Sequence, residues 1–160
     1  MIYLVTGLII MSVLVDQVLK WIVCNTLEIG QSVPLIDGVF HFTYIRNFGA
    51  AFSILQNRLS FLILITVLIT AVLLVFLYRT RKTANKLMLI SIPLIIGGGI
   101  GNLIDRIRLG YVVDFLDFCL IHFPVFNFAD CCVTIGAALL VLGFLTWDDG
   151  RRDRKGELDG

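Results

Sequence analysis

Four long runs of apolar residues, separated by shorter polar stretches, are the strongest pattern in this chain. They cover residues 2–24, 59–78, 87–104 and 128–147, each bound being approximate. A helix needs about 20 mainly apolar residues to cross the hydrocarbon core of a bilayer, and each run approaches that length. The pattern predicts one integral membrane domain over residues 1–160, with four spanning helices and a charged tail at about 148–160.

The segment between the first two runs contains a second kind of pattern. Phe40, Phe42 and Tyr44 alternate with other residues, which is typical of a β-strand with one face on an apolar surface. A glycine-containing turn follows at residues 46–49, and a short amphipathic stretch comes after it. Such a stretch is suited to the membrane surface.

Composition agrees with a membrane protein and excludes one class of partner. The chain is 58% apolar and 16% charged, whereas soluble domains are about 45–50% apolar. The formal net charge is only +1. A nucleic-acid-binding protein needs a basic face, so we expect no nucleic acid partner.

The positions of the basic residues predict an orientation. One cluster lies between the second and third runs and another in the tail: Arg79, Arg81, Lys82 and Lys86, then Arg151, Arg152, Arg154 and Lys155. The positive-inside rule places such clusters in the cytoplasm. Both termini would then be cytoplasmic, and the segments around residues 25–58 and 105–127 would face outward.

The third run contains five residues, Gly97 to Gly101, of which four are glycine. The run does not follow a strand and lacks the spacing of a phosphate-binding loop. Gly97 and Gly101 have the G-x-x-x-G spacing that allows close contact between membrane helices. We therefore predict that this helix packs tightly against a neighbour.

Polar residues gather where the third and fourth helices reach the outer face. Asn102, Asp105 and Arg106 lie within one turn at the end of the third helix. Asp114 follows in the second external segment, and Asp130 falls in the first turn of the fourth helix. Since these helices are sequential and antiparallel, the two acids can meet there. Asn127 is placed to cap the fourth helix, whose N-terminus favours a carboxylate.

Carboxylates at the level of a bilayer are costly and are functional candidates by default. Two that lie close together cannot both ionise cheaply, so the pair shares a proton near neutral pH. One can then accept a proton from water while the other polarises a carbonyl, as in aspartic proteases. Which aspartate holds the proton stays open at this stage. The structural alternative is that Asp114 pairs with Arg106 or Arg108 while Asp130 only caps its helix.

Other polar residues carry weaker signals. Asp16 and Lys20 are spaced to form an ion pair on the first helix, which could tie the helix end to the external loop or serve the chemistry. The cysteines and histidines lack the spacing of a metal site, so we expect no metal and no cofactor.

Five motifs occur in order along the chain. They are Asp16-Gln17-x-x-Lys20, Arg46-Asn47-x-Gly49-Ala50-Ala51-Phe52, Gly101-Asn102-x-Ile104-Asp105-Arg106, Val112-Val113-Asp114-Phe115 and Phe126-Asn127-x-Ala129-Asp130. Together they closely resemble the lipoprotein signal peptidases of bacteria, also called signal peptidase II. The resemblance extends from the first helix to the fourth.

This resemblance implies a fold, a reaction and a set of site residues. The fold would be an all-α polytopic membrane protein with four spanning helices, a small extracytoplasmic β-cradle and a short surface helix. Asp114 and Asp130 would form the catalytic dyad. The supporting or substrate-binding positions would be Asn47, Gly49, Asn102, Asp105, Arg106, Asn127, Asp16 and Lys20. Of these, we expect Asn47 to hydrogen-bond the backbone of the substrate.

The resemblance also implies a substrate and a location. The substrate would be a prolipoprotein whose cysteine already carries diacylglycerol, cleaved just before that cysteine. The enzyme would be a monomer in the bacterial inner membrane, in contact with membrane lipid, with its site near the outer face.

Two rival functions are weighed against this one. The first is a small transporter or channel subunit with Asp114 and Asp130 on an ion path, and the second is a non-catalytic assembly factor. A transporter typically shows internal repeats or helices broken at mid-membrane. This sequence has no repeat, and its two acids lie at helix ends. The peptidase reading is favoured.

Overall fold

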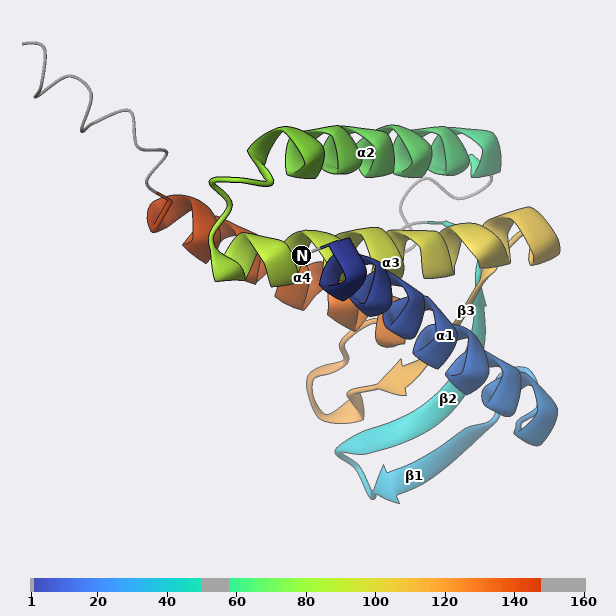
Figure 1. Cartoon of the computed structure of the whole chain (residues 1–160). Coiled ribbons are helices and arrows are strands. Elements are labelled where there is room, and N and C mark those ends of the chain that lie inside the picture. The colour runs from blue at the N-terminus through green and yellow to red at the C-terminus, as the bar shows by residue number, and fades with distance from the viewer. Residues whose placement is uncertain (1, 50–57, 148–160) are drawn as a thin grey trace, which may run out of the picture.

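The computed structural model describes residues 2–49 and 58–147. Its elements in chain order are α1 (Ile2–Thr26), β1 (Ser32–Ile36), β2 (Phe40–Asn47), α2 (Leu59–Thr80), α3 (Lys86–Leu109), β3 (Val112–Asp117), the 3-10 turn η2 (Cys119–Ile121) and α4 (Phe128–Leu145). Four of the described helices are long and apolar enough to cross a membrane (Figure 1). The predicted four-helix membrane architecture with a small sheet is confirmed.

Helix α3 is the centre of the bundle. It contacts α1, α2 and α4, most extensively α4, and Figure 1 shows α3 between α2 on one side and α1 on the other. In the most apolar stretch of α3, 50% of the residues are buried, against 6% in α2. The apolar surface of α2 is therefore left for lipid, whereas α3 is covered by protein.

The glycine run allows α3 to approach two neighbours at once. A Cβ atom at Gly97 would lie 2.7 Å from the Cβ of Ser12 on α1, and one at Gly101 would lie 2.6 Å from Oδ2 of Asp16. A Cβ at Gly98 would overlap the backbone oxygen of Ala129 on α4. The predicted close helix contact at these glycines is confirmed.

Helix α3 continues past Ile104, where the apolar run stops, and ends at Leu109. Gly110 follows in a left-handed conformation (φ 80°) and donates its backbone N–H to the oxygen of Arg106. This conformation suits glycine, which lacks a Cβ. Within this last stretch, Asp105 and Arg106 have polar partners elsewhere in the protein.

The three strands form one antiparallel sheet in the order β1-β2-β3. Tyr44 of β2, with Val113 and Phe115 of β3, forms a buried cluster with Val23 of α1. The strand predicted from the alternating aromatic residues is thus confirmed, and its apolar face lies against the C-terminal end of α1.

The position expected for Asp114 needs a correction. It lies on strand β3 and not in an external loop. Residues 112–115 are all buried, so the strand is covered on both faces. Such a strand has no alternating pattern and is hard to distinguish from other apolar segments in a sequence. The expected surface helix and the charged tail fall on residues 50–57 and 148–160, which lie outside the described residues.

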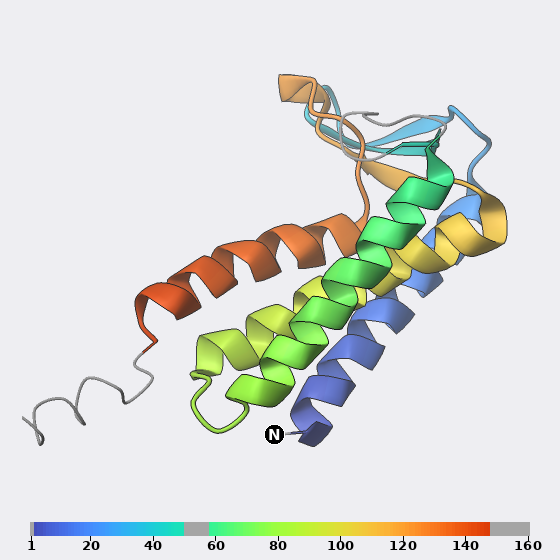
Figure 2. The same ribbon diagram turned by 90° about the horizontal axis from the view of Figure 1, so that it is seen from above.

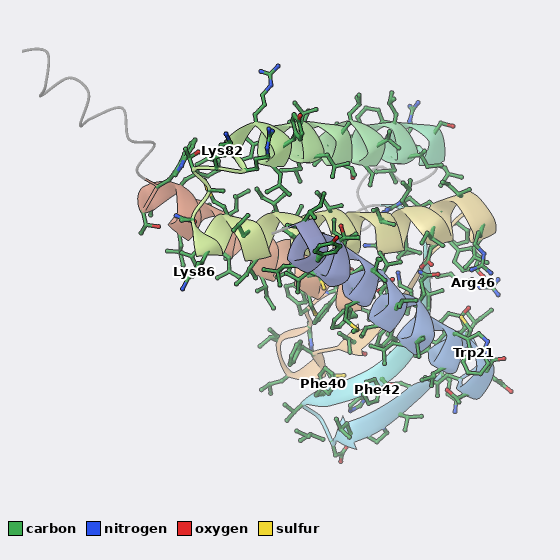
Figure 3. The ribbon with its side chains drawn as sticks, viewed as in Figure 1. Trp21, Phe40, Phe42, Arg46, Lys82 and Lys86 are labelled. Atoms are coloured by element: carbon green, nitrogen blue, oxygen red, sulfur yellow. The ribbon has the colours of Figure 1, made fainter. Side chains whose placement is uncertain are left out.

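The two ends of the bundle differ in their contents. Figure 3 shows Lys82 and Lys86 at one end, beside the turn between α2 and α3, and Arg46 and Trp21 at the opposite end. The N-terminus of α1 lies at the first of these ends and the sheet at the second (Figure 2). The polar residues near the end of α3 therefore lie at the sheet end.

Candidate active site

Asp114 is held on strand β3 by two side-chain amides. It is 2% exposed. Asn47 at the end of β2 donates from Nδ2 to Oδ2 of Asp114 over 2.9 Å, and Asn127 donates from Nδ2 to Oδ1 over 2.6 Å. Both oxygens of this carboxyl group therefore have a fixed donor.

Asp130 is held in the first turn of α4 by a reciprocal cap. Its backbone N–H donates to Oδ1 of Asn127 over 3.0 Å, and the N–H of Asn127 donates to Oδ2 of Asp130 over 3.2 Å. Asn102 on α3 donates from Nδ2 to Oδ1 of Asp130 over 2.8 Å. The predicted cap by Asn127 is confirmed. The helix N-terminus and these donors favour a charged carboxylate at this position.

Asn127 joins the two aspartates in one hydrogen-bonded network. Its side chain donates to Asp114, and its backbone N–H donates to Asp130. The same side-chain nitrogen also donates to Oδ1 of Asn102 over 3.1 Å. The network thus brings together β3, α3 and the start of α4.

The environment of Asp114 raises its pKa to about 7 from the ordinary 3.8. Burial is the largest cause, because it disfavours the charged form, and the charge of Asp130 acts in the same direction. The hydrogen bonds from Asn47 and Asn127 and the charge of Lys20 lower the pKa and offset part of this rise. Asp114 can therefore hold or release a proton near neutral pH.

A buried ion-pair cluster lies on α1 and α3 next to this network. Nζ of Lys20 is 2.9 Å from Oδ2 of Asp16 and 2.9 Å from Oδ2 of Asp105. It also donates to Oδ1 of Asn102 over 2.9 Å. Of the two alternatives for Asp16 and Lys20, the tie to the external loop is wrong, because Lys20 contacts Asp105 and Asn102 on α3. The reason is that Gly101 lets α3 come close to this face of α1.

Arg106 connects α3 to the turn after β2. Its Nη2 donates to the backbone oxygen of Gly49 over 3.2 Å, and its Nη1 donates to that of Asn102 over 3.5 Å. Gly49 in turn donates its N–H to Oδ1 of Asn47 over 2.9 Å. Asn47, expected to meet the substrate, is in contact with Asp114 here. The structural alternative required an ion pair between Asp114 and Arg106 or Arg108. In the described part of the chain, Asp114 forms no such ion pair.

Gln17 also takes part in this cluster, a role that was not predicted from the sequence. Its Nε2 donates to Oδ1 of Asp105 over 2.9 Å and to the backbone oxygen of Gly101 over 3.2 Å. The available signal was a second polar residue directly after Asp16 within an apolar helix. Its role depends on α3 lying opposite, which no local pattern reveals.

A groove between α2, α3 and α4 leads to Asp130. Its volume is about 210 Å³, and its polar lining residues include Asn102, Arg106 and Asp130. The rest of its lining is mainly apolar and comes from the membrane-spanning parts of the three helices. A second hollow between α1 and the sheet is lined almost entirely by apolar side chains and contains neither aspartate. Of these two hollows, the groove is the one lined by an aspartate of the network, Asp130.

The same fold occurs in two solved structures described as bacterial membrane enzymes, both determined by the in meso method. The one at 2.3 Å resolution is 37% identical, with a TM-score of 0.80 over 88% of this chain and 87% of the other. The one at 1.9 Å is also 37% identical, with a TM-score of 0.78 over 89% and 92%. The fold is that of a polytopic membrane enzyme.

Sequence similarity identifies the family to which this chain belongs. The family model for signal peptidase (SPase) II matches residues 8–146. The lipoprotein signal peptidase of Halothermothrix orenii is 49% identical over 89% of this chain and 93% of its own length. That of Brevibacillus brevis is 45% identical over 95% and 98%. The chain belongs to the signal peptidase II family, and this membership supports a peptidase over a transporter subunit or an assembly factor.

Proposed function

We propose that this protein is an aspartic signal peptidase that cleaves prolipoproteins just before a diacylglyceryl-modified cysteine. The observation that carries the proposal is the contact of Asn127 with both Asp114 and Asp130, next to a groove that Asp130 lines. Two carboxyl groups joined in this way, one of them with a pKa of about 7, suit proton transfer in opposite directions.

In the proposed reaction, Asp130 is the base and Asp114 the acid. Asp130 lies at a helix N-terminus with donors on both oxygens, which favours its charged form. Asp114 is buried beside that charge and keeps a proton up to about pH 7. This assigns the proton that the sequence left unassigned.

The proton transfers balance over one cycle. Water adds to the carbonyl carbon of the scissile bond, giving one proton to Asp130, while the proton of Asp114 passes to the carbonyl oxygen. The resulting gem-diol collapses when Asp114 takes a proton back from one hydroxyl, the C–N bond breaks, and Asp130 protonates the departing nitrogen. Both carboxyl groups return to their starting state. The products are the free signal peptide and the amino terminus of the lipidated cysteine.

The groove suggests why the substrate carries lipid. Its polar end lies at Asp130 and Arg106, and its mainly apolar remainder runs between spanning helices. Burial of acyl chains contributes about 0.8 kcal/mol per CH₂. A diacylglyceryl group can therefore hold the scissile bond at the depth of the acids. A peptide without lipid would have to leave water to reach that depth, and it would lack this contribution.

The proposed orientation puts both termini in the cytoplasm of a bacterium and the site near the outer face of its inner membrane. It rests on the basic cluster at the α2–α3 turn, which lies at the end of the bundle opposite the sheet (Figure 3). In a background without native cysteines, a cysteine at Gln31 should react with an impermeant reagent applied from outside. A cysteine at Thr83 should not react, and labelling there would reverse the orientation.

The proposal is tested by cleavage of a lipidated precursor by purified protein in detergent. Asp114→Asn and Asp130→Asn should each lower kcat by more than about 10⁴-fold, because an amide keeps the shape but cannot transfer the proton. Asp117→Asn is the matched control: it changes a carboxyl on the same strand that accepts from Thr43 over 2.7 Å, and it should remain active. Turnover by either dyad variant near the level of the control would remove that residue from the chemistry.

The lipid requirement is tested with the same assay. A precursor of identical sequence without its diacylglyceryl group should be cleaved far more slowly. Equal rates would contradict this account of substrate selection and leave the dyad untouched.

A further inference from the structure

Three charged side chains are buried in the membrane-spanning part of the protein without lining the groove. Asp16 is 0% exposed, and Lys20 and Asp105 are each 3% exposed. Burying charges is costly even when they are paired, and apolar residues of similar volume often serve stability as well. Because the three side chains are closed off from the groove, they do not touch a substrate bound in it. Their presence calls for another role.

The two carboxylates of this cluster have a second set of partners on the backbone. Oδ1 of Asp16 accepts the N–H of Ala129 over 2.9 Å, and Oδ2 of Asp105 accepts the N–H of Val113 over 3.1 Å. Ala129 directly precedes Asp130, and Val113 directly precedes Asp114. Each carboxylate therefore holds the chain at the residue before one of the two proposed catalytic aspartates.

We propose that Lys20 is a positioning residue, which fixes the segments that carry Asp114 and Asp130 relative to each other through Asp105 and Asp16. The ammonium group binds both carboxylates at 2.9 Å, so it ties together two backbone anchors that are far apart in the sequence. This inference rests on the proposed function of the two aspartates.

A third contact of Lys20 orients a side chain of the dyad network. An ammonium group has donors and no acceptor. Lys20 therefore requires the oxygen of the Asn102 amide to face it, and the hydrogen bond has a length of 2.9 Å. The NH₂ group of Asn102 then points away and donates to Asp130. Lys20 thus influences Asp130 through both its backbone and its carboxylate.

Removing the ammonium group should separate the two anchors. Asp16 and Asp105 would then face each other across a buried site without a cation, and like charges repel strongly there. A displacement of a catalytic group by about 1 Å can cost about 10²-fold in rate. We therefore expect a loss of kcat, with the groove and its affinity for substrate preserved.

The first measurement is kinetic. Lys20→Met should lower kcat on the lipidated precursor by about 100-fold and change KM by less than about threefold. The matched control is Asn85→Ala, which removes a polar contact between α3 and α4 at the other end of the bundle, 2.9 Å from Nδ2 to the oxygen of Gly143. It should retain kcat. An unchanged kcat in Lys20→Met would overturn the proposal.

A second variant guards against a simple failure to fold. In Lys20→Met with Asp16→Asn, one of the two opposing charges is also removed, so thermal stability should recover. The kcat should stay low, because the link between the two anchors is still missing. Recovery of kcat together with stability would show a purely structural role and overturn the proposal.

The closing measurement is hydrogen exchange, which does not depend on activity. In the double variant, amide exchange in peptides containing Val113 and Ala129 should become at least about tenfold faster, which corresponds to about 1.4 kcal/mol of lost protection, while α2 stays unchanged. Unchanged exchange at both segments would overturn the inference. Faster exchange with fully active Asp114→Asn and Asp130→Asn would retain the anchoring and refute the proposed dyad instead.

Discussion

Helices α3 and α4 are connected by an asparagine at each end of the pair, and the two asparagines have different hydrogen-bond partners. At the end away from the sheet, Asn85 caps α3 by accepting the N–H of Met88 over 3.0 Å and donates to the backbone oxygen of Gly143 on α4. At the sheet end, Asn127 caps α4 and donates to Asn102 on α3. Both residues are helix caps that also connect the two helices.

Asn85 and Asn127 differ in the residues that surround them. Beneath Asn85 lies an apolar cluster that includes Met88 and Ile92, both 0% exposed. Around Asn127 lie carboxyl groups that have no equivalent in that cluster, Asp114 and Asp130. The same residue type in the same local geometry thus has an apolar cluster beside it at one end and, at the other, the two aspartates of the proposed dyad.

The sharpest test of this comparison exchanges each asparagine for alanine. Asn127→Ala should lower kcat by about 10² to 10³-fold, because Asp114 loses the amide donor to its Oδ1 and the backbone N–H of Asp130 loses its acceptor. Loss of a cap costs about 0.5–2 kcal/mol at either position, so Asn85→Ala should lower the melting temperature to a similar extent and keep its kcat. Comparable losses of kcat in the two variants would remove the distinction between the ends.

Two adjacent glycines provide the next test, at the sheet end of α3. Gly98→Ala should lower stability by about 1–3 kcal/mol and reduce activity markedly, because its Cβ would displace Ala129 and with it Asp130. Gly99→Ala is the control for stability, since its Cβ would lie 3.7 Å from the nearest atom, the Thr66 methyl group. Melting curves for both variants test the packing, and the cleavage rate of Gly98→Ala tests its effect on Asp130. If Gly99→Ala proved the more damaging, the packing argument would be wrong.

A smaller effect is expected for Asn47→Ala. This variant removes one of two amide donors to Asp114 and leaves the cap of α4 intact. We expect kcat to fall about tenfold. A loss of this size is close to the free energy that one hydrogen bond to a charged group contributes. Steady-state cleavage measures this directly. An effect as large as that of Asn127→Ala would mean that Asn47 also binds the substrate, as the sequence suggested.

The last prediction concerns the dependence of stability on pH through Asp114. Since its pKa in the folded protein is about 7 and its ordinary value is 3.8, the folded state holds this proton more tightly than the unfolded chain. The stability that the proton contributes is complete below the ordinary value and is lost as pH rises to about 7. The melting temperature of Asp114→Asn relative to the natural protein should therefore rise across this window and then level off. For Asn85→Ala the difference should be the same at each pH.

The helices and the cap of α4 could be predicted because they depend on local signals. Apolar runs define spanning helices by length alone, and Asn127 followed by Asp130 has the spacing of a helix cap. The C-terminal end of α3 was harder to predict, since the apolar run stops at Ile104 while the helix continues to Leu109.

The parts that escaped prediction all depend on contacts between distant segments. Strand β3 has no alternating pattern because both of its faces are covered. Gln17 and Lys20 reach Asp105 only because glycines bring α1 and α3 together. The backbone anchors at Val113 and Ala129 involve N–H groups, which no side-chain pattern reveals.

Asn127 caps α4 and also donates to Asp114, which restricts the residues that can replace it. At an ordinary helix N-cap, serine, threonine, aspartate and asparagine are nearly interchangeable, so the position is a favourite for stabilising redesign. Here the side chain must accept one hydrogen bond from Asp130 and donate two others, to Asp114 and Asn102. A hydroxyl group has one proton to give, and an aspartate would place a third acid between the two already present. An engineer who optimised caps by helix statistics alone would keep the helix and lose the enzyme.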